Sequence, residues 1–270
     1  PEEIECVMVW GHPKGSLEKF KNLKLIFSMG AGVDHILNDD TIPKNIPISR
    51  IVDPQMAFSM TNYILMAVLN YQRCWYDFQD AQKKNHWAQF EFDEKDLKIG
   101  VYGIGHLGMD AANALYRLGF EVFGYSNSLK ETIFPSFYGE QLLDFLNKIN
   151  VLVCTVPLTP KTRGLLCTKF FKKLPNPTYL INVSRGAVHV ENDIIKAIKE
   201  GKLTGAFLDV FEKEPLPKDS PLWQNPKIKI TPHIASLTYA KESIRQALDN
   251  FQRVKNGGKP LNEVSRDNMY

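Results

Sequence analysis

Three polar residues that each follow a short apolar run could together perform acid–base chemistry at a carbonyl group. Arg185, Glu214 and His233 stand after three separate apolar runs of the chain. A guanidinium can bind a carboxylate through two parallel hydrogen bonds, and an imidazolium can donate a proton to a keto oxygen. A carboxylate beside the imidazole would stabilise its protonated form. If the fold brings these side chains together, they could hold a small carboxylic acid and protonate the carbonyl next to it.

Each of these residues also has a simpler interpretation. Glu214 could be a turn residue before Pro215, and Arg185 could be a surface charge. A solitary histidine is more often structural than catalytic, but His233 shares a motif with Pro232 at the end of a predicted strand. We interpret the other histidine side chains as structural and expect no metal site, because no third ligand has suitable spacing; these histidines are His12, His35, His86, His106 and His189.

A glycine pattern indicates a phosphate-binding turn. Gly103, Gly105 and Gly108 form G-x-G-x-x-G between an apolar run and an alanine-rich helical pattern. The first glycine permits a tight turn, the second allows the backbone to touch a pyrophosphate, and the third lets helix and strand pack closely. The free N–H groups of the helix N-terminus would then bind the phosphates. An ordinary strand-to-helix turn is the alternative.

The next predicted strand, 121–125, should be followed by the residue that contacts the adenosine ribose. In NAD-binding proteins this residue is Asp or Glu, but here it is Ser126. Ser126, Asn127 and Ser128 can donate hydrogen bonds to a 2′-phosphate, and Lys130 can add a positive charge. The arginine that commonly fills this role is absent, so the sequence favours NADP and leaves NAD open. A solvated turn is the simpler interpretation of these residues.

The elements that must position these groups alternate between strand and helix. This order is typical of parallel sheets covered by helices on both faces, so we predict an α/β fold. Helical patterns occupy 107–118, 192–200 and a segment that starts near Leu237, and a long helix is expected over Gln55–Lys84. The predicted strands are 4–10, 23–27, 46–50, 97–102, 121–125, 151–155, 178–182, 203–209 and 228–231.

The whole-chain properties are those of an ordinary globular protein. The 270 residues are 44% hydrophobic and 23% charged, with a formal net charge of +3, which gives no indication of nucleic-acid binding. The longest uncharged stretch, 54–72, contains too many polar residues for a membrane span. Four cysteines without a CxxC pair favour reduced thiols and a cytoplasmic location.

Several motifs occur in an order that resembles the D-isomer-specific 2-hydroxyacid dehydrogenase family. Besides the glycine pattern, they are 156–159 with 162–164, 182–186, 208–215 and 231–234. Five further segments resemble the glyoxylate/hydroxypyruvate reductase A branch: 9–10, 29–34, 86–87, 220–223 and 265–270. The resemblance covers essentially the whole chain, and several motifs matched in order are far more specific than any one of them.

The resemblance implies two doubly wound parallel-sheet domains. Residues 95–236 would form a Rossmann cofactor domain, 59–94 a connecting helix and linker, and 1–58 with 237–270 a smaller flavodoxin-like substrate domain. This substrate domain would lack its first strand–helix unit, on the order of 30–45 residues. The implied activity is the reduction of a small 2-ketoacid, such as glyoxylate or hydroxypyruvate, to a D-2-hydroxyacid with NAD(P)H.

The resemblance also implies roles for individual residues. Arg185 would bind the substrate carboxylate and keto oxygen, His233 would donate the proton, and Glu214 would pair with His233. Asp209 would hold the nicotinamide carboxamide. The substrate would also contact Trp10 and the N–H groups of Ala31 and Gly32, and the cofactor would contact Gly103, Gly105, His106, Leu107, Gly108, Ser126, Asn127, Ser128, Lys130, Thr155, Pro157, Val183, Asp209 and Ser236.

The sequence also bears on two other functions and on a possible homodimer. A short-chain dehydrogenase is discarded, because no tyrosine has a lysine four positions later. A nicotinamide-sensing interaction protein, like the C-terminal-binding corepressors, stays open because such proteins can keep the Arg, Glu and His. The apolar helix over Gln55–Lys84 suggests a homodimer, with an intramolecular spacer as the alternative.

Overall fold

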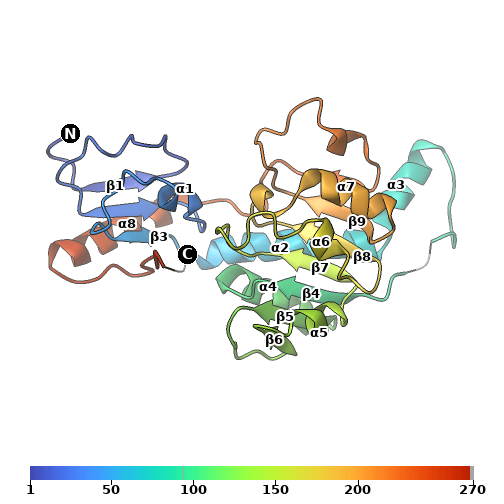
Figure 1. The fold of residues 1–270 in the computed structure, drawn as a ribbon. Coiled ribbons are helices and arrows are strands. Elements are labelled where there is room, and N and C mark those ends of the chain that lie inside the picture. The colour runs from blue at the N-terminus through green and yellow to red at the C-terminus, as the bar shows by residue number, and fades with distance from the viewer. Residues whose placement is uncertain (93, 268–270) are drawn as a thin grey trace. The chain divides into compact units, whose positions relative to one another are not determined.

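The chain forms two compact units, each with a parallel sheet (Figure 1). The computed structural model describes residues 1–92 and 94–267; the last three residues of the 265–270 motif lie outside this range. The first unit contains Pro1–Met56, Pro157–Pro160 and the chain from Leu237 onward, and the second contains Ala57–Val156 and Lys161–Ser236. The parallel sheets agree with the predicted α/β class.

The second unit contains a seven-stranded sheet in which every neighbouring pair of strands is parallel. The strand order reverses between β4 and β7, which is the topological switch point where doubly wound sheets bind ligands. In spatial order the strands are β10 (Ile228–Ile230), β9 (Leu203–Leu208), β8 (Thr178–Asn182), β7 (Val151–Cys154), β4 (Lys98–Tyr102), β5 (Glu121–Ser126) and β6 (Ser136–Tyr138).

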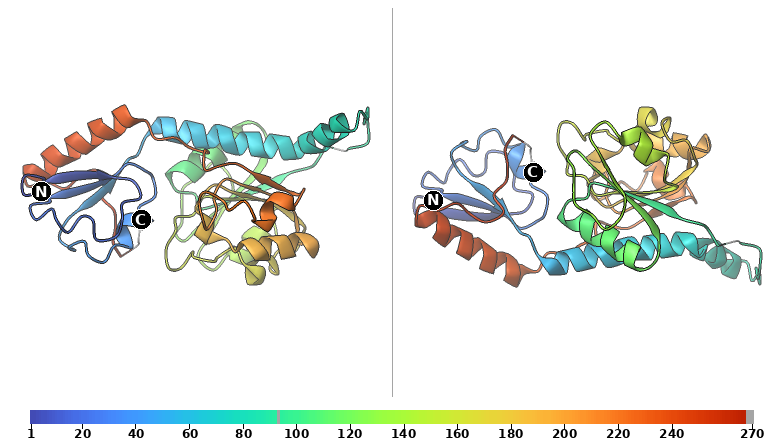
Figure 2. Two further views of the ribbon diagram at one scale, coloured as in Figure 1. Left: turned by 90° about the horizontal axis from the view of Figure 1, so that it is seen from above. Right: turned by 90° about the horizontal axis from the view of Figure 1, so that it is seen from below.

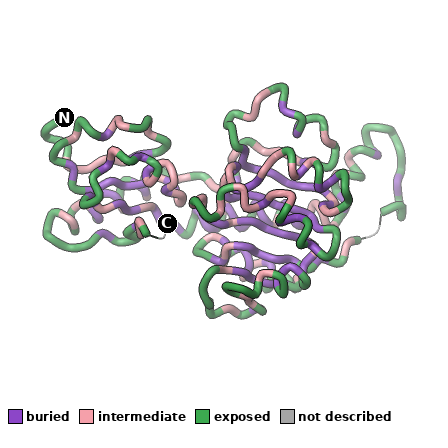
Figure 3. The backbone as a smooth tube through the Cα atoms, in the orientation of Figure 1, coloured by how far each residue is buried: buried purple, intermediate pink, exposed green. Residues whose placement is uncertain are grey.

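Helices cover both faces of this sheet (Figure 2). On one face, α2 (Pro54–Gln72) and α4 (His106–Arg117) pack in one apolar cluster with β4, β7 and β8. The other face carries α5 (Leu142–Leu146), α6 (Thr168–Phe171) and α7 (Glu191–Lys199). Because both faces are covered, every residue of β7 and β8 is buried (Figure 3).

The first unit contains a parallel three-stranded sheet in the order β1 (Cys6–Val9), β2 (Leu25–Ser28) and β3 (Ile48–Arg50). It also contains a short helix, α1 (Asp34–Leu37), and α8 (Ala240–Lys255). The buried amide of Asn250 on α8 bonds to Ser49 and to both backbone groups of Leu261. These bonds fix α8 and the segment that follows it to the edge strand β3.

The single long helix expected over Gln55–Lys84 is wrong. The structure has two helices, α2 and α3 (Trp75–Lys83), separated by Arg73 and Cys74. Cys74 adopts a left-handed conformation with φ of 52°, and its carbonyl accepts the first hydrogen bonds of α3. The Lys95 ammonium lies 2.8 Å from its Sγ. A left-handed residue ends an α-helix, and helical periodicity in the sequence does not reveal it.

The other predicted elements form close to their expected positions. Each predicted strand is present with ends within two residues, and the helical patterns at 107–118, 192–200 and the C-terminus correspond to α4, α7 and α8. The sequence missed β6 and the short α1, α5 and α6, because three to five residues carry too little periodicity. No helix in the described part of the chain is long and apolar enough to cross a membrane.

Candidate functional site

The glycine turn joins β4 to α4 at the switch point of the sheet. Gly103 has φ of 108°, a conformation that favours glycine, and its carbonyl accepts a hydrogen bond from Thr155 Oγ1 at 2.8 Å. A Cβ on Gly108 would lie 2.3 Å from the Gly103 oxygen and 2.6 Å from Thr155 Oγ1. The internal packing of the protein therefore requires both of these glycines.

Gly105 differs from the other two glycines. Its φ is −79°, and a Cβ built on it would have no heavy atom within 4 Å. Neither its conformation nor its packing demands a glycine, and the space beside it is open. Gly105 precedes the exposed His106 and the half-buried Leu107, in the first turn of α4, where backbone N–H groups lack intrahelical acceptors. Open space beside such N–H groups fits a dinucleotide pyrophosphate.

The last residue of β5 and the segment after it present hydroxyl, amide and ammonium groups. Ser126 is half-buried and donates from Oγ to the Ser128 carbonyl at 2.6 Å, which shapes the turn. Asn127, Ser128 and Lys130 are exposed. The Tyr125 hydroxyl donates to the Gly139 carbonyl, anchoring β5 beside this turn. No carboxylate occupies position 126, so the segment offers donors and positive charge where a 2′-phosphate would lie.

Arg185 lies on a loop that packs directly on another loop of the site. Its Nη1 donates to the Ser184 carbonyl at 2.9 Å. The next residue, Gly186, is buried, and a Cβ on it would lie 1.8 Å from the Phe211 carbonyl carbon. Only glycine permits this close approach of two backbones. The loop that carries Arg185 therefore rests on the loop that carries Glu214.

Glu214 and His233 form the predicted pair. Glu214 Oε2 lies 2.7 Å from His233 Nδ1, and Glu214 Oε1 accepts the Phe211 N–H at 2.9 Å. Burial raises the pKa of Glu214, but hydrogen bonds from His233 and Phe211, together with the charges of His233 and Arg185, outweigh this and hold the pKa below its usual value. The charge of Arg185 thus acts on the same carboxylate that pairs with His233.

His233 is held by the backbone of Asp209, a buried residue at the end of the neighbouring strand. It has a left-handed φ of 55°, and its N–H donates to the Asp209 carbonyl at 2.8 Å. Asp209 Oδ1 accepts from Thr231 Oγ1 and the Ile234 N–H, and Oδ2 accepts from the Ala235 N–H. Asp209 is fully buried and orders the whole 231–235 loop. Most of its acceptor capacity is thus used within the protein, and its predicted contact with the nicotinamide carboxamide stays a prediction.

One contributor to this loop was missed by the sequence analysis. The Tyr63 hydroxyl on α2 hydrogen-bonds Thr231 Oγ1, which in turn donates to Asp209. Burial raises the pKa of Tyr63 well above its usual value, so the phenol is neutral. No local pattern links a helix residue to a loop 168 positions later, and only the tertiary structure identifies it.

The remaining predicted cofactor contacts differ in exposure. Thr155 and Ser236 are half-buried. Val183 is buried in the apolar cluster that α2 and α4 form with the sheet. Pro157 is exposed and belongs to the 157–160 segment assigned to the first unit. Thr155 already donates to Gly103, so it supports the glycine turn from β7.

The first unit places Trp10, Ala31 and Gly32 beside one another. Trp10 follows β1 and is 58% exposed, and a Cβ on Gly30 would lie 1.9 Å from its ring. The carbonyls of Gly30 and Gly32 accept hydrogen bonds from the buried Ser28 hydroxyl. The N–H groups of Ala31 and Gly32 have no acceptor among the described residues. Two such neighbouring N–H groups can bind an anion.

Arg50 is a second residue that the sequence analysis missed. Its Nη1 donates to the Ala31 carbonyl at 3.3 Å, and burial lowers the pKa of its guanidinium. No ion pair links it to a carboxylate within the described part of the chain. This cation thus fixes the orientation of the Ala31 peptide and adds positive potential beside the glycine loop.

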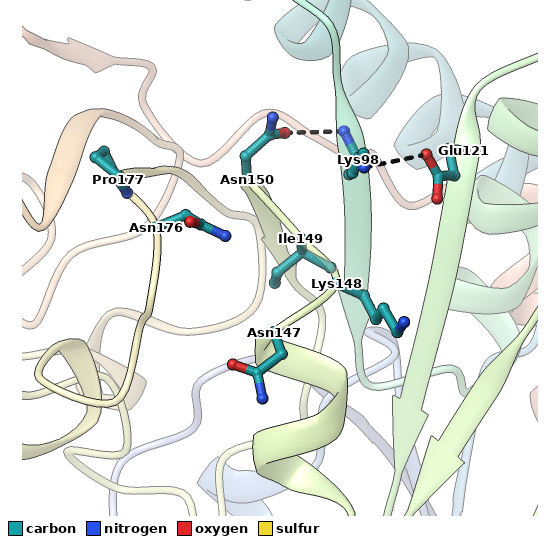
Figure 4. A pocket seen from close by; sticks show the side chains of 8 residues that line it. All are labelled: Lys98, Glu121, Asn147, Lys148, Ile149, Asn150, Asn176 and Pro177. Atoms are coloured by element: carbon teal, nitrogen blue, oxygen red, sulfur yellow. Dashed lines mark hydrogen bonds and ion pairs between the residues drawn. The ribbon is translucent and has the colours of Figure 1, made fainter.

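A polar pocket of about 520 Å³ lies at the amino ends of strands in the seven-stranded sheet (Figure 4). It is formed where β4, β5 and β7 begin, whereas the glycine turn lies where β4 ends. Lys98 bonds through its N–H to Asn150 Oδ1, and its ammonium lies 3.9 Å from Glu121. These groups satisfy one another at the surface, so this pocket is not part of the candidate site.

Comparisons with known proteins identify the family of the chain. Residues 65–235 match the family model described as D-isomer specific 2-hydroxyacid dehydrogenase, NAD binding domain. A glyoxylate/hydroxypyruvate reductase A from Photorhabdus laumondii subsp. laumondii is 40% identical over 264 residues, which cover 95% of this chain and 84% of that protein.

Two solved structures have the same fold. A D-isomer specific 2-hydroxyacid dehydrogenase from Xanthobacter autotrophicus Py2, in complex with NADPH and MES, has a TM-score of 0.93 and 37% identity, covering 100% of this chain and 86% of that one. An NADPH-dependent glyoxylate/hydroxypyruvate reductase from Sinorhizobium meliloti, in complex with NADP and sulfate, has a TM-score of 0.94 and 32% identity, covering 100% and 87%. The chain therefore belongs to the D-isomer specific 2-hydroxyacid dehydrogenase family.

Proposed function

We propose that this protein is an NADPH-dependent reductase of small 2-ketoacids, with glyoxylate or hydroxypyruvate as the substrate, and that it forms the D-isomer wherever the product is chiral. The observation that carries this proposal is the 2.7 Å hydrogen bond between Glu214 and His233, with Arg185 near enough to affect the pKa of Glu214. A proton donor, its carboxylate partner and a carboxylate-binding cation are the groups that ketoacid reduction needs from the protein.

The proposed mechanism assigns one task to each side chain. Arg185 binds the substrate carboxylate and keto oxygen, and the N–H groups of Ala31 and Gly32 bind carboxylate oxygen, with Trp10 as a wall. His233 donates its Nε2 proton to the keto oxygen, because its Nδ1 is engaged with Glu214. Glu214 stabilises the imidazolium before this transfer. The nicotinamide, when bound, supplies the hydride that reduces the carbonyl carbon.

The proposed cofactor is NADPH, with NADH as the weaker alternative. The turn formed by Gly103, Gly105 and Gly108 and the N–H groups of His106 and Leu107 would bind the pyrophosphate. The other proposed contacts are the 2′-phosphate with Ser126, Asn127, Ser128 and Lys130, and the remaining cofactor atoms with Thr155, Pro157, Val183, Asp209 and Ser236. Both solved relatives described above are complexes with NADPH or NADP, which supports this choice.

The relatives favour an enzyme over the nicotinamide-sensing interaction protein, since each is named as a reductase or dehydrogenase. The test is the loss of NADPH absorbance on addition of glyoxylate, hydroxypyruvate or phenylpyruvate, with NADH in parallel. We expect rapid oxidation of NADPH with one of the first two substrates and at least a 100-fold loss of kcat/KM in Arg185→Gln, about 3 kcal/mol. NADPH binding without turnover of any ketoacid would instead support the interaction protein.

We also propose a homodimer and a cytoplasmic location. Exposed apolar side chains along α2 and α3, including Phe58 at 65% and Trp75 at 51%, favour a partner surface on these helices. Light scattering should give twice the chain mass of 30.8 kDa, and a value of one chain mass would contradict the dimer. The support for a cytoplasmic location is that the four cysteines form no disulfide bond with one another.

A further inference from the structure

The backbone of Arg185 is fixed by a buried amide. Asn182 ends β8 with no exposed surface, and its side chain bonds only to the segment that follows it. Oδ1 accepts from the Ser184 N–H at 3.0 Å and from the Ser184 hydroxyl at 2.7 Å. Nδ2 donates to the Arg185 carbonyl at 3.3 Å and lies 2.8 Å from His189 Nδ1. All four hydrogen-bonding positions of the amide are therefore used.

These contacts decide the tautomer of His189. A backbone N–H can only donate, so the amide atom that faces the Ser184 N–H must be oxygen. The nitrogen of Asn182 must then face the Arg185 carbonyl and His189. Because this nitrogen can only donate, His189 Nδ1 must accept, and the ring proton must be on Nε2.

The burial of His189 is energetically unfavourable. It is 2% exposed, and burial lowers its pKa to about 4, so the ring is neutral near pH 7. Its Nε2 is buried and has no hydrogen-bond partner among the described residues. A buried N–H without an acceptor destabilises the fold, and an aliphatic side chain would avoid this cost. What the imidazole provides here, and an aliphatic side chain cannot, is the hydrogen-bond acceptor Nδ1 for Asn182.

We propose that His189 is a positioning residue for substrate binding, which acts through Asn182 on Arg185. Without an acceptor at Nδ1, the amide of Asn182 keeps three of its four hydrogen bonds but is held less rigidly, so the donor to the Arg185 carbonyl is less firmly fixed. A guanidinium that must meet a carboxylate in one geometry then spends less time in place. This inference rests on the proposed function, in which Arg185 binds the ketoacid carboxylate. It also assigns a role to a histidine that the sequence analysis interpreted as structural.

The experiment compares His189→Leu with His189→Asn in the full-length chain. Asn places an oxygen acceptor near the position of Nδ1, whereas Leu removes the acceptor at similar size. We expect His189→Leu to raise KM for glyoxylate about five- to tenfold, the effect of one lost hydrogen bond, with kcat and KM for NADPH changed less than about twofold. His189→Asn should restore KM to within about twofold of the wild type.

A matched control and a second variant make the test decisive. Ile194→Val removes a methyl group from the fully buried face of α7 without touching the amide, so it should leave KM unchanged. If His189→Leu does not fold, Ser184→Ala loosens the same amide at Oδ1 and should raise KM. The inference is overturned if both variants keep the wild-type KM, or if His189→Asn is as impaired as His189→Leu. Failure of the proposed function would be visible separately, as the absence of ketoacid turnover by the wild type, and failure of the role of Arg185 as wild-type kcat/KM in Arg185→Gln.

Discussion

The pairing of Glu214 with His233 gives the sharpest prediction, which is the effect of Glu214→Gln. This substitution keeps a hydrogen-bond acceptor 2.7 Å from His233 Nδ1 but removes the negative charge. Two unit charges at this separation attract by about 1.5 kcal/mol in water and about 6 kcal/mol at an effective dielectric constant of 20. The side chains are 34% and 33% exposed, so solvent screening places the value near the lower limit.

The expected loss is about 1.5–3 kcal/mol, the range for a hydrogen bond to a charged group, and it corresponds to about a 10- to 150-fold fall in kcat/KM. The assay is NADPH oxidation with glyoxylate at neutral pH. Glu212→Gln removes an exposed charge two residues away and is the matched control, which should stay within about twofold of the wild type. A Glu214→Gln enzyme as active as the control would refute the reasoning.

The same pair predicts a pH dependence. Because the pKa of Glu214 is held below its usual value, the carboxylate stays ionised through neutral and mildly acidic pH. Its stabilisation of the His233 imidazolium is present above the ordinary glutamate pKa and is lost as the pH falls through the lowered pKa. We expect the acidic limb of the kcat/KM profile to lie below the usual glutamate range, and an acidic limb at or above that range would contradict this assignment.

Four further substitutions test the supporting parts of the site. Asp209→Asn replaces one acceptor oxygen with an NH2 group that cannot accept the Ala235 N–H. We therefore expect the free energy of unfolding, measured in urea, to fall by about 1–3 kcal/mol, and kcat to fall as well. Gly105→Ala fits the protein without a clash, so thermal unfolding should be unchanged while NADPH affinity, measured by fluorescence titration, falls at least about tenfold; Gly108→Ala should lower both. Lys130→Ala should raise KM for NADPH about five- to tenfold and leave KM for NADH unchanged, and equal effects on both cofactors would remove the 2′-phosphate assignment.

Local sequence accounts for most of the fold because parallel strands buried on both faces are continuous apolar runs. The runs at 151–155 and 178–182 correspond to β7 and β8, in which every residue is buried. The glycine pattern identified its turn for the same kind of reason, since a side chain would strain the backbone at Gly103 and clash with the Gly103 carbonyl at Gly108. Short elements such as β6, and the break between α2 and α3 at Cys74, were missed because their local patterns are too weak.

The sequence by itself determined the residue types that the chemistry needs: the apolar strands, the glycines of the turn, and the polar residues that follow strand ends. These depend on local backbone geometry and on the rule that the carboxyl ends of parallel strands share one edge. Only the tertiary structure decided which groups hold them in place. Tyr63 reaches Thr231, Arg50 reaches Ala31, and His189 accepts from Asn182 through contacts that form when distant or irregular segments pack, and no periodic pattern encodes such contacts.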